Sequence, residues 1–235
     1  MPYSYKNFLY LLNNTFINEV SQYYLMTKLI CLDMDGVIFK DINFWLELHK
    51  AFGTYEQGFE LTKKYLHTDY NKLVYEVVQK LWKGKDAKPY FDLINSLEYL
   101  PGVKEFFEHI KKQNYRTAII SASSIDVARR VQRDYDINYL YANELIIEDN
   151  KVSGEFVWPI AAGKEKKAEI ITHLAQDLNI PLKEITCVGD SDMDVEAFKI
   201  VGLAIAFNSS SKELQEVADI IVDSHNLADV IDHIL

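Results

Sequence analysis

The chain has 235 residues, of which 49% are hydrophobic and 26% are charged, so its composition is that of a globular protein and not of a disordered one. Its 25 basic and 35 acidic residues give a net charge of −10. This balance argues against nucleic acid as a main partner, because phosphate backbones are bound by clustered lysines and arginines. Cys31 and Cys187 are too few for a disulfide framework, and both lie in apolar runs, so we expect buried free thiols in a reducing cytoplasm.

Residues 1–25 combine aromatic side chains with asparagine, glutamate and glutamine. They lack a basic start followed by a clean apolar stretch, so they are not typical of a signal peptide. They form either an N-terminal extension before a natural start at Met26 or a helix packed on the core, and both interpretations stay open. No apolar run reaches the roughly 18–20 residues that a membrane span needs, so we expect a cytoplasmic protein without a membrane partner.

Short apolar runs alternate with helical patterns along most of the chain. Strands are predicted at 28–33, 117–121, 185–188 and 203–207, and helices at 104–113, 125–134 and 165–178. Residues 145–148 and 152–156 flank Asp149-Asn150, a pattern that predicts a small β-hairpin. The alternation predicts an α/β fold with a Rossmann-like, mostly parallel sheet, whose core comprises residues 26–39 and 99–235.

Residues 40–98 differ from the rest because they show only helical patterns, between the first strand and the next strand–helix unit. We therefore predict an inserted, all-helical cap over one edge of the sheet. The segment holds 11 of the chain's 30 aromatic residues, 9 lysines, 9 acidic residues and no arginine. The aromatic residues either line a pocket for an organic leaving group or pack the cap's own core, and we expect the second of most of them.

Polar side chains follow several predicted strands abruptly. The first strand ends in Asp33 and Asp35, the next in Ser121, and a later one in Asp190 with Asp194 shortly after it. Ligands of parallel α/β sheets bind beyond these strand ends. Carboxylates gathered there would repel one another without a cation, and hard oxygen ligands suit Mg²⁺. Each aspartate alone is more typical of a turn or helix cap, but the joint pattern favours a metal site.

These motifs resemble those of haloacid dehalogenase-superfamily phosphatases. The matching residues are Asp33-Met34-Asp35-Gly36-Val37, Ser121, a lysine at a later helix start and Gly189-Asp190-x-x-x-Asp194. The resemblance covers about residues 28–235. From Asn143 onward it is closest to the phosphoserine-phosphatase-like branch, through ELIIEDNKVSGEF, KKAEII and VGDSDMDVEAFKIVGLAIAF. It implies hydrolysis of a phosphomonoester, a small phosphorylated metabolite, with Mg²⁺ as cofactor.

The resemblance also implies a role for each matched residue. Asp33 would be the nucleophile that forms an aspartyl-phosphate, and Asp35 would be the general acid and base. Phosphate oxygens would be held by Ser121, by backbone N–H groups near it such as that of Ala122, and by the lysine. The metal would be held by the Asp33 carboxylate, the Asp35 backbone carbonyl and Asp190, with Asp194 as a further ligand or as an orienting group.

Three lysines compete for the phosphate-binding position, because Lys164, Lys166 and Lys167 all start the same predicted helix. Lys167 matches the family position and shares a helix face with Ile171. Lys164 shares a face with Ile171 as well, so periodicity alone does not decide between them. We assign the role to Lys167, with Lys164 as the alternative, and three solvated surface lysines as the non-functional interpretation.

The sequence departs from the phosphoserine-phosphatase-like branch in two of the motifs and in the cap. Met193 stands where the branch usually has asparagine, and Ser121-Ala122-Ser123 stands where it has Ser-Gly-Gly. The family's substrate-binding glutamate matches Ile42, with Asp41 beside it, and the cap has no arginine. We therefore expect L-phosphoserine to be a poor substrate. The alternatives are a phosphosugar mutase of the same superfamily, a true phosphoserine phosphatase, a phospho-acceptor signalling domain and a binding protein with an inactive site.

Overall fold

The computed structural model describes residues 28–40, 42–160 and 163–234. Their seven strands form one sheet in the order β4-β3-β2-β1-β5-β6-β7, in which only the β3–β4 pair is antiparallel. The strands are β1 (Leu29–Leu32), β2 (Arg116–Ser124), β3 (Tyr139–Glu148), β4 (Lys151–Val157), β5 (Ile185–Gly189), β6 (Leu203–Phe207) and β7 (Ile220–Val222). The prediction of a mostly parallel α/β sheet is confirmed.

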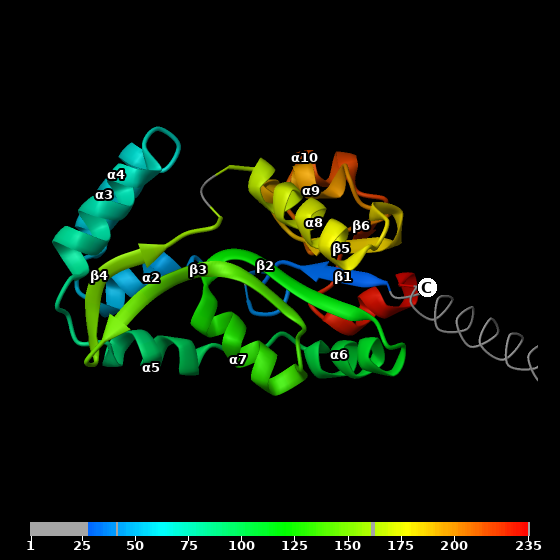
Figure 1. Cartoon of the computed structure of the whole chain (residues 1–235), viewed down its shortest axis with the longest axis horizontal. Helices are drawn as coiled ribbons and strands as arrows, with labels where there is room; N and C mark the ends of the chain where they lie inside the picture. Colours follow the sequence, from blue (N-terminus) through cyan, green and yellow to red (C-terminus); the bar gives the residue numbers. More distant parts are fainter. Residues whose placement is uncertain (1–27, 41, 161–162, 235) are drawn as a thin grey trace, which may run out of the picture.

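Helices cover both faces of the sheet (Figure 1). One face carries α8 (Glu165–Leu178), α9 (Val195–Phe198) and α10 (Lys212–Val217), and the other carries α6 (Val103–Lys112), α7 (Ile125–Tyr135) and the 3₁₀ segment η4 (Leu227–His233). Successive residues of β1 point to opposite faces, so Leu29 and Cys31 join one hydrophobic core while Ile30 and Leu32 join the other. All four are buried, which makes β1 the centre of both cores.

The chain between β1 and α6 is helical, as predicted. It contains α2 (Phe44–Ala51), α3 (Tyr55–Tyr65), α4 (Tyr70–Val74), the π-helix η1 (Tyr75–Trp82) and α5 (Lys88–Ser96). Figure 1 shows β3 and β4 extending from the sheet toward these helices. The hairpin packs on η1, in which Gln79 Nε2 donates to the Gly154 carbonyl at 2.6 Å. Just after η1, the N–H of Gly84 donates to the Val152 carbonyl at 2.8 Å. The division into a core and a cap at residues 40 and 98 stays a prediction.

The hairpin has the predicted turn but a longer first strand. Asp149 and Asn150 both have positive φ, 48° and 59°, as a two-residue type I′ turn requires. β3 starts at Tyr139, six residues before the predicted start, and pairs with β2 before it pairs with β4. The start of β3 was missed because Tyr139, Leu140 and Tyr141 do not alternate between apolar and polar residues. In the structure all three are half-buried, on both faces of the strand.

Several smaller expectations concern the termini and the cysteines. Cys31 and Cys187 are buried free thiols on neighbouring strands, as predicted, and burial raises the pKa of the Cys31 thiol. In the described ranges no helix is both long and apolar enough to cross a membrane. The interpretation of residues 1–25 and the position of Asp41 lie outside the described residues.

Two hydrogen bonds of one buried tyrosine join the inserted helices to the end of β2 and to α7. Tyr90 of α5 is fully buried, and its hydroxyl lies 2.6 Å from Ser124 Oγ and donates to Asp126 Oδ2 at 2.8 Å. We expect Tyr90→Phe to lower the free energy of unfolding by about 1–3 kcal/mol, because it removes the partner of the buried Ser124 hydroxyl and of the charged Asp126 carboxylate. Tyr99→Phe, which removes a similar bond to Asp134 at an exposed position, should cost less. Urea unfolding measures both losses, and equal losses would contradict this account.

Candidate active site

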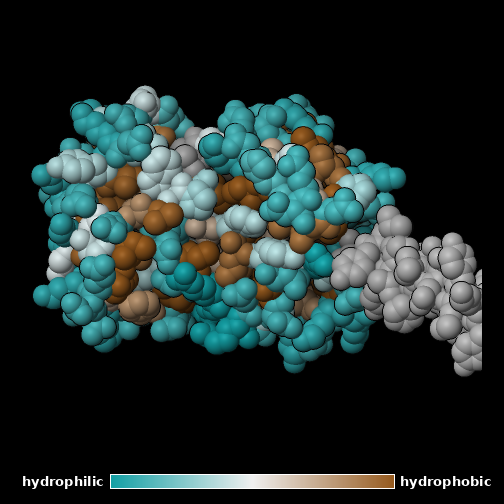
Figure 2. Space-filling model, viewed as in Figure 1, coloured by the Kyte–Doolittle hydropathy of each residue, from teal (hydrophilic) through white to brown (hydrophobic). Residues whose placement is uncertain are grey.

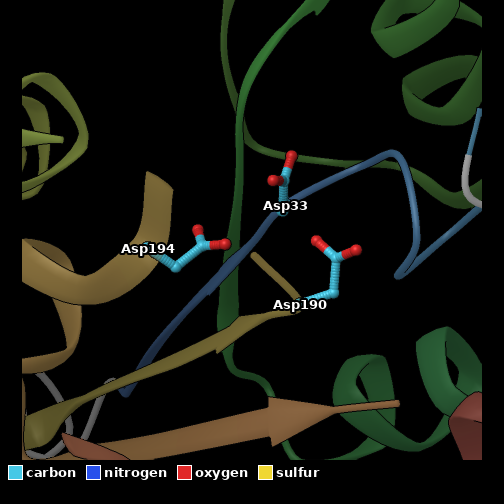
Figure 3. Close-up of side chains that lie close together, drawn as sticks. All are labelled: Asp33, Asp190 and Asp194. Carbon is cyan, nitrogen blue, oxygen red and sulfur yellow. The ribbon is translucent and has the colours of Figure 1, made fainter. Parts of the chain in front are cut away.

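Three carboxylates meet where β1 and β5 end. Asp33 follows β1, Asp190 follows β5, and Asp194 ends the short 3₁₀ turn η3 (Asp192–Asp194). One carboxylate oxygen from each lies within 4.8 Å of those of the other two. Figure 3 shows the three side chains coming from these different segments to one place. Since β1 and β5 are parallel neighbours, the fold brings together the residues that the sequence predicted to converge.

Two glycines leave room for these carboxylates against the backbone. A Cβ atom on Gly36, whose φ is +79°, would lie 2.0 Å from Asp190 Oδ2, and one on Gly189 would lie 2.3 Å from Asp194 Cγ. Any larger residue would displace a carboxylate at either position. The result is a set of clustered hard oxygen donors of the kind that binds Mg²⁺, so the residues present fit that ion.

Lys167 lies between two of the three carboxylates. Its Nζ donates to Asp33 Oδ2 at 2.5 Å and to Asp194 Oδ1 at 2.6 Å, and the residue is 2% exposed. Burial alone would lower the pKa of the Lys167 ammonium, but the carboxylates of Asp194 and Asp33 outweigh it and raise that pKa. Burial also raises the pKa of Asp194, with Lys167 opposing it and Asp33 adding to it. One ammonium therefore bonds two of the three clustered carboxylates, and the third, that of Asp190, lies beside this pair.

The other two lysines at this helix start lie at the surface. Lys164 Nζ contacts Glu213 Oε2 at 2.6 Å, and Lys166 Nζ contacts Glu169 Oε2 at 2.7 Å. The structure thus places Lys167 among the predicted site residues and Lys164 outside them.

Asp33, Asp190 and Lys167 line a cavity of about 270 Å³ at the strand ends. Its wall comprises Asp33, Asp35, Ile42, Asn43, Phe44, Trp45, Ser121, Ala122, Ser123, Lys167, Asp190, Ser191 and Met193. All the predicted catalytic and phosphate-binding residues are present, and so are Ile42 and Met193, where the sequence departs from the family pattern. The side chain of Asp194 lies behind the wall, where its Oδ2 accepts from the N–H of Ser191 at 3.3 Å.

The segment after Ser121 is fixed from two sides. The carbonyl of Ala122 accepts hydrogen bonds from Trp45 Nε1 and from Asn143 Nδ2, both at 2.9 Å. Asn143 is fully buried and also donates to the Ile160 carbonyl at 3.0 Å. Ser123 Oγ is buried in the cavity wall and has no hydrogen-bond partner among the described residues. A buried hydroxyl in that position fits a bound anion, because an unmade hydrogen bond there is costly.

Sequence reasoning did not assign Trp45, Asn143 or Ser123 to the site. Trp45 and Asn143 are 77 and 21 residues from Ala122 in sequence, and no local pattern predicts contacts over such separations. Only Ser123 has a local signal, since it is a polar residue two positions after Ser121, at the end of an apolar run.

Comparison with known proteins agrees with this geometry. The model of the haloacid dehalogenase-like hydrolase family matches residues 27–202. A phosphoserine phosphatase from Saccharomyces cerevisiae is 29% identical over 217 residues, which cover 90% of this chain and 68% of that protein. One from Methanocaldococcus jannaschii is 26% identical over 211 residues, 88% of this chain and 97% of that protein. The solved structure of a phospho-aspartyl intermediate analogue of phosphoserine phosphatase has the same fold, with a TM-score of 0.75 at 24% identity over 89% of this chain and 99% of that one.

The chain belongs to the haloacid dehalogenase-like hydrolase family. The predicted resemblance is therefore confirmed, and so is the prediction of a phosphatase of this family.

Removing the Lys167 ammonium should destabilise the metal-free protein. Lys167→Met leaves the buried Asp33 and Asp194 carboxylates uncompensated, so we expect it to lose about 3–5 kcal/mol of unfolding free energy at pH 8 in EDTA. Because burial and Asp33 already raise the pKa of Asp194, loss of the opposing lysine raises it further. The folded variant then binds more protons than the unfolded chain, so the loss shrinks toward pH 5.

The matched control is Lys164→Met, which breaks the exposed pair with Glu213 and should have little effect at either pH. Urea unfolding at pH 8 and pH 5 measures both variants. A Lys167→Met loss that is equal at the two pH values would contradict the charge argument.

Proposed function

We propose that the protein is a cytoplasmic, Mg²⁺-dependent phosphomonoester hydrolase that acts on a small phosphorylated metabolite through an aspartyl-phosphate. The observation that carries the proposal is the position of Asp33. This carboxylate lies beside Lys167 and among two further carboxylates, in a cavity that Asp35 and Ser121 also line.

Asp33 is held in a fixed orientation for nucleophilic attack. The N–H of Met34 donates to its Oδ1 at 2.6 Å, and Lys167 donates to its Oδ2 at 2.5 Å. In the first step an Asp33 oxygen bonds to phosphorus, the bond from phosphorus to the ester oxygen breaks, and Asp35 gives that oxygen a proton. In the second step Asp35 takes a proton from water, whose oxygen bonds to phosphorus and releases Asp33 and inorganic phosphate.

The anionic phosphate needs compensating charge and hydrogen-bond donors beside an anionic nucleophile. Lys167 supplies charge, and Ser121, the N–H of Ala122 and Ser123 would supply hydrogen bonds to phosphate oxygens. Mg²⁺ would be held by Asp33, Asp190 and the Asp35 backbone carbonyl, with Asp194 as a ligand or an orienting group. When bound, the ion would add positive charge against the phosphate oxygens.

A phosphoserine phosphatase is the second candidate, supported by the names of the similar proteins from yeast and Methanocaldococcus jannaschii. The cavity wall favours a different metabolite. At the position of the family's substrate-binding glutamate it has Ile42, and none of the chain's four arginines, all of which are described, lines it.

Asp33→Asn should abolish hydrolysis of 4-nitrophenyl phosphate in the presence of Mg²⁺, because a neutral amide is a poor nucleophile. The control is Asp192→Asn, at an exposed aspartate in the same loop as Asp190, which should stay active. EDTA should silence the unmodified protein, and added Mg²⁺ should restore it. Turnover by Asp33→Asn at the unmodified rate would exclude Asp33 as nucleophile, and activity that survives chelation would exclude the metal.

Asp35→Asn tests the general acid separately. We expect its rate on alkyl phosphates to fall by about 10²–10⁴-fold, the range typical of general acid–base catalysis. The decrease in the rate of the first step should be smaller for 4-nitrophenyl phosphate, whose leaving group needs less protonation. Burst kinetics on both substrates separate the two steps, and equal first-step losses would count against the acid role.

A further inference from the structure

A second cavity, of about 110 Å³, lies among the inserted helices next to the cavity of the candidate active site. Asn43 and Trp45 line both cavities, so the two share a wall. The rest of the second wall comprises Leu46, His49, Thr62, Leu66, Tyr70, Leu73, Val74, Val77, Val78, Trp82 and Phe156. We refer to this space as the apolar cavity.

Trp45 contacts both the phosphate-binding segment and the apolar cavity. The Trp45 indole N–H is bonded to the Ala122 carbonyl beside the predicted phosphate position, while its ring packs on Phe156 and Trp82 with centroids 5.2 Å and 6.3 Å away. One face of the phosphate-binding segment and one face of the apolar cavity are thus set by a single side chain. A group esterified to a phosphate at Asp33 would meet Trp45 as it leaves the strand ends.

The apolar cavity is uncharged. No lysine, arginine, aspartate or glutamate of the described chain lines it, and burial lowers the pKa of its single histidine, His49, to about 4, so that ring is neutral at pH 7. His49 Nδ1 is already paired with Thr54 Oγ1 at 2.8 Å, and Asn43 Oδ1 accepts from the Leu46 N–H at 3.1 Å. The cap lysines Lys72 and Lys80 lie over the rings of Tyr65 and Tyr75 instead.

An ammonium or carboxylate would lose its hydration in this cavity without gaining a partner of opposite charge. An alkyl chain or a small ring would gain from burial there, and apolar cavities of ~150 Å³ are known to bind benzene. We propose that the apolar cavity binds the leaving group of the substrate, and that the substrate class is phosphomonoesters of uncharged, apolar alcohols. This inference rests on the proposed function and adds to it the chemistry of the alcohol.

Alkyl phosphates test the proposal because their leaving groups have similar basicity. We expect kcat/KM to rise by about fourfold for each methylene group that enters the apolar cavity, and by at least tenfold from ethyl to hexyl phosphate. Val74→Phe, which fills the cavity from α4, should reduce the hexyl-to-ethyl ratio of kcat/KM at least tenfold. The matched control is Val157→Phe, at a residue 54% exposed on β4 that lines neither cavity, and it should keep the ratio. A ratio below threefold in the unmodified protein would overturn the inference.

Isobutyl phosphate and L-phosphoserine make a sharper pair, because both are esters of a branched CH–CH2–O group and they differ in two methyl groups against an ammonium and a carboxylate. We expect kcat/KM to favour isobutyl phosphate by tenfold or more. A tenfold preference for L-phosphoserine, with rejection of the D-isomer, would overturn the inference in favour of a phosphoserine phosphatase.

Calorimetric binding of non-hydrolysable phosphonates in Mg²⁺ separates this inference from the proposed function. The unmodified protein should bind hexylphosphonate at least tenfold more tightly than methylphosphonate, whether or not it turns over any ester. Tighter hexylphosphonate binding without turnover of any phosphomonoester would reject the hydrolase and keep the apolar subsite. Turnover together with equal phosphonate affinities would keep the hydrolase and reject the subsite.

Discussion

Mutual repulsion among carboxylates is the constraint that organises the functional end of this protein. Asp33, Asp190 and Asp194 bring oxygens within 4.8 Å of one another, and Asp194 is almost fully buried. Such a cluster is unfavourable unless positive charge enters it. Lys167 supplies one positive charge through bonds to Asp33 and Asp194, and a bound cation would supply more. The same carboxylates would therefore serve both metal binding and catalysis.

The order of the strands in the sheet determines which residues lie together at this site. β1 lies between β2 and β5, so Asp33 after β1, Ser121 near the end of β2 and Asp190 after β5 lie side by side although they are far apart in sequence. Lys167 reaches the same point from the first turn of α8, which packs on the face of the sheet that holds Leu29 and Cys31. Gly36 and Gly189 then remove the side chains that would collide with Asp190 and Asp194. Packing in the hydrophobic core thus sets the geometry of the polar site.

The sequence predicted the parallel sheet and the site carboxylates because both leave local signals. Apolar runs that end in aspartate mark a strand and its carboxyl end together, as at Asp33 and Asp190. Helical periodicity could not separate Lys167 from Lys164, because the choice depends on which face α8 packs against the sheet. The start of β3, half-buried on both faces, also lacked a periodic signal, and the bond from Trp45 to Ala122 depends on how the inserted helices dock. The features that the sequence did not predict depend on tertiary packing and not on local preferences.

The motif residues of the sheet and the residues of the inserted helices would contact different parts of the substrate. The residues that match the family motifs would surround the phosphate and would be indifferent to the alcohol, because phosphorus and its oxygens are the same in every monoester. Discrimination among alcohols has to come from the walls beyond, and those include Ile42, Phe44, Trp45 and Met193 in this chain. The first set follows the motifs of that family, whereas Ile42 and Met193 of the second set depart from the phosphoserine-phosphatase-like pattern. A shared reaction therefore transfers between these proteins more securely than a shared substrate, since buried charges on an amino-acid leaving group need partners that an apolar wall does not contain.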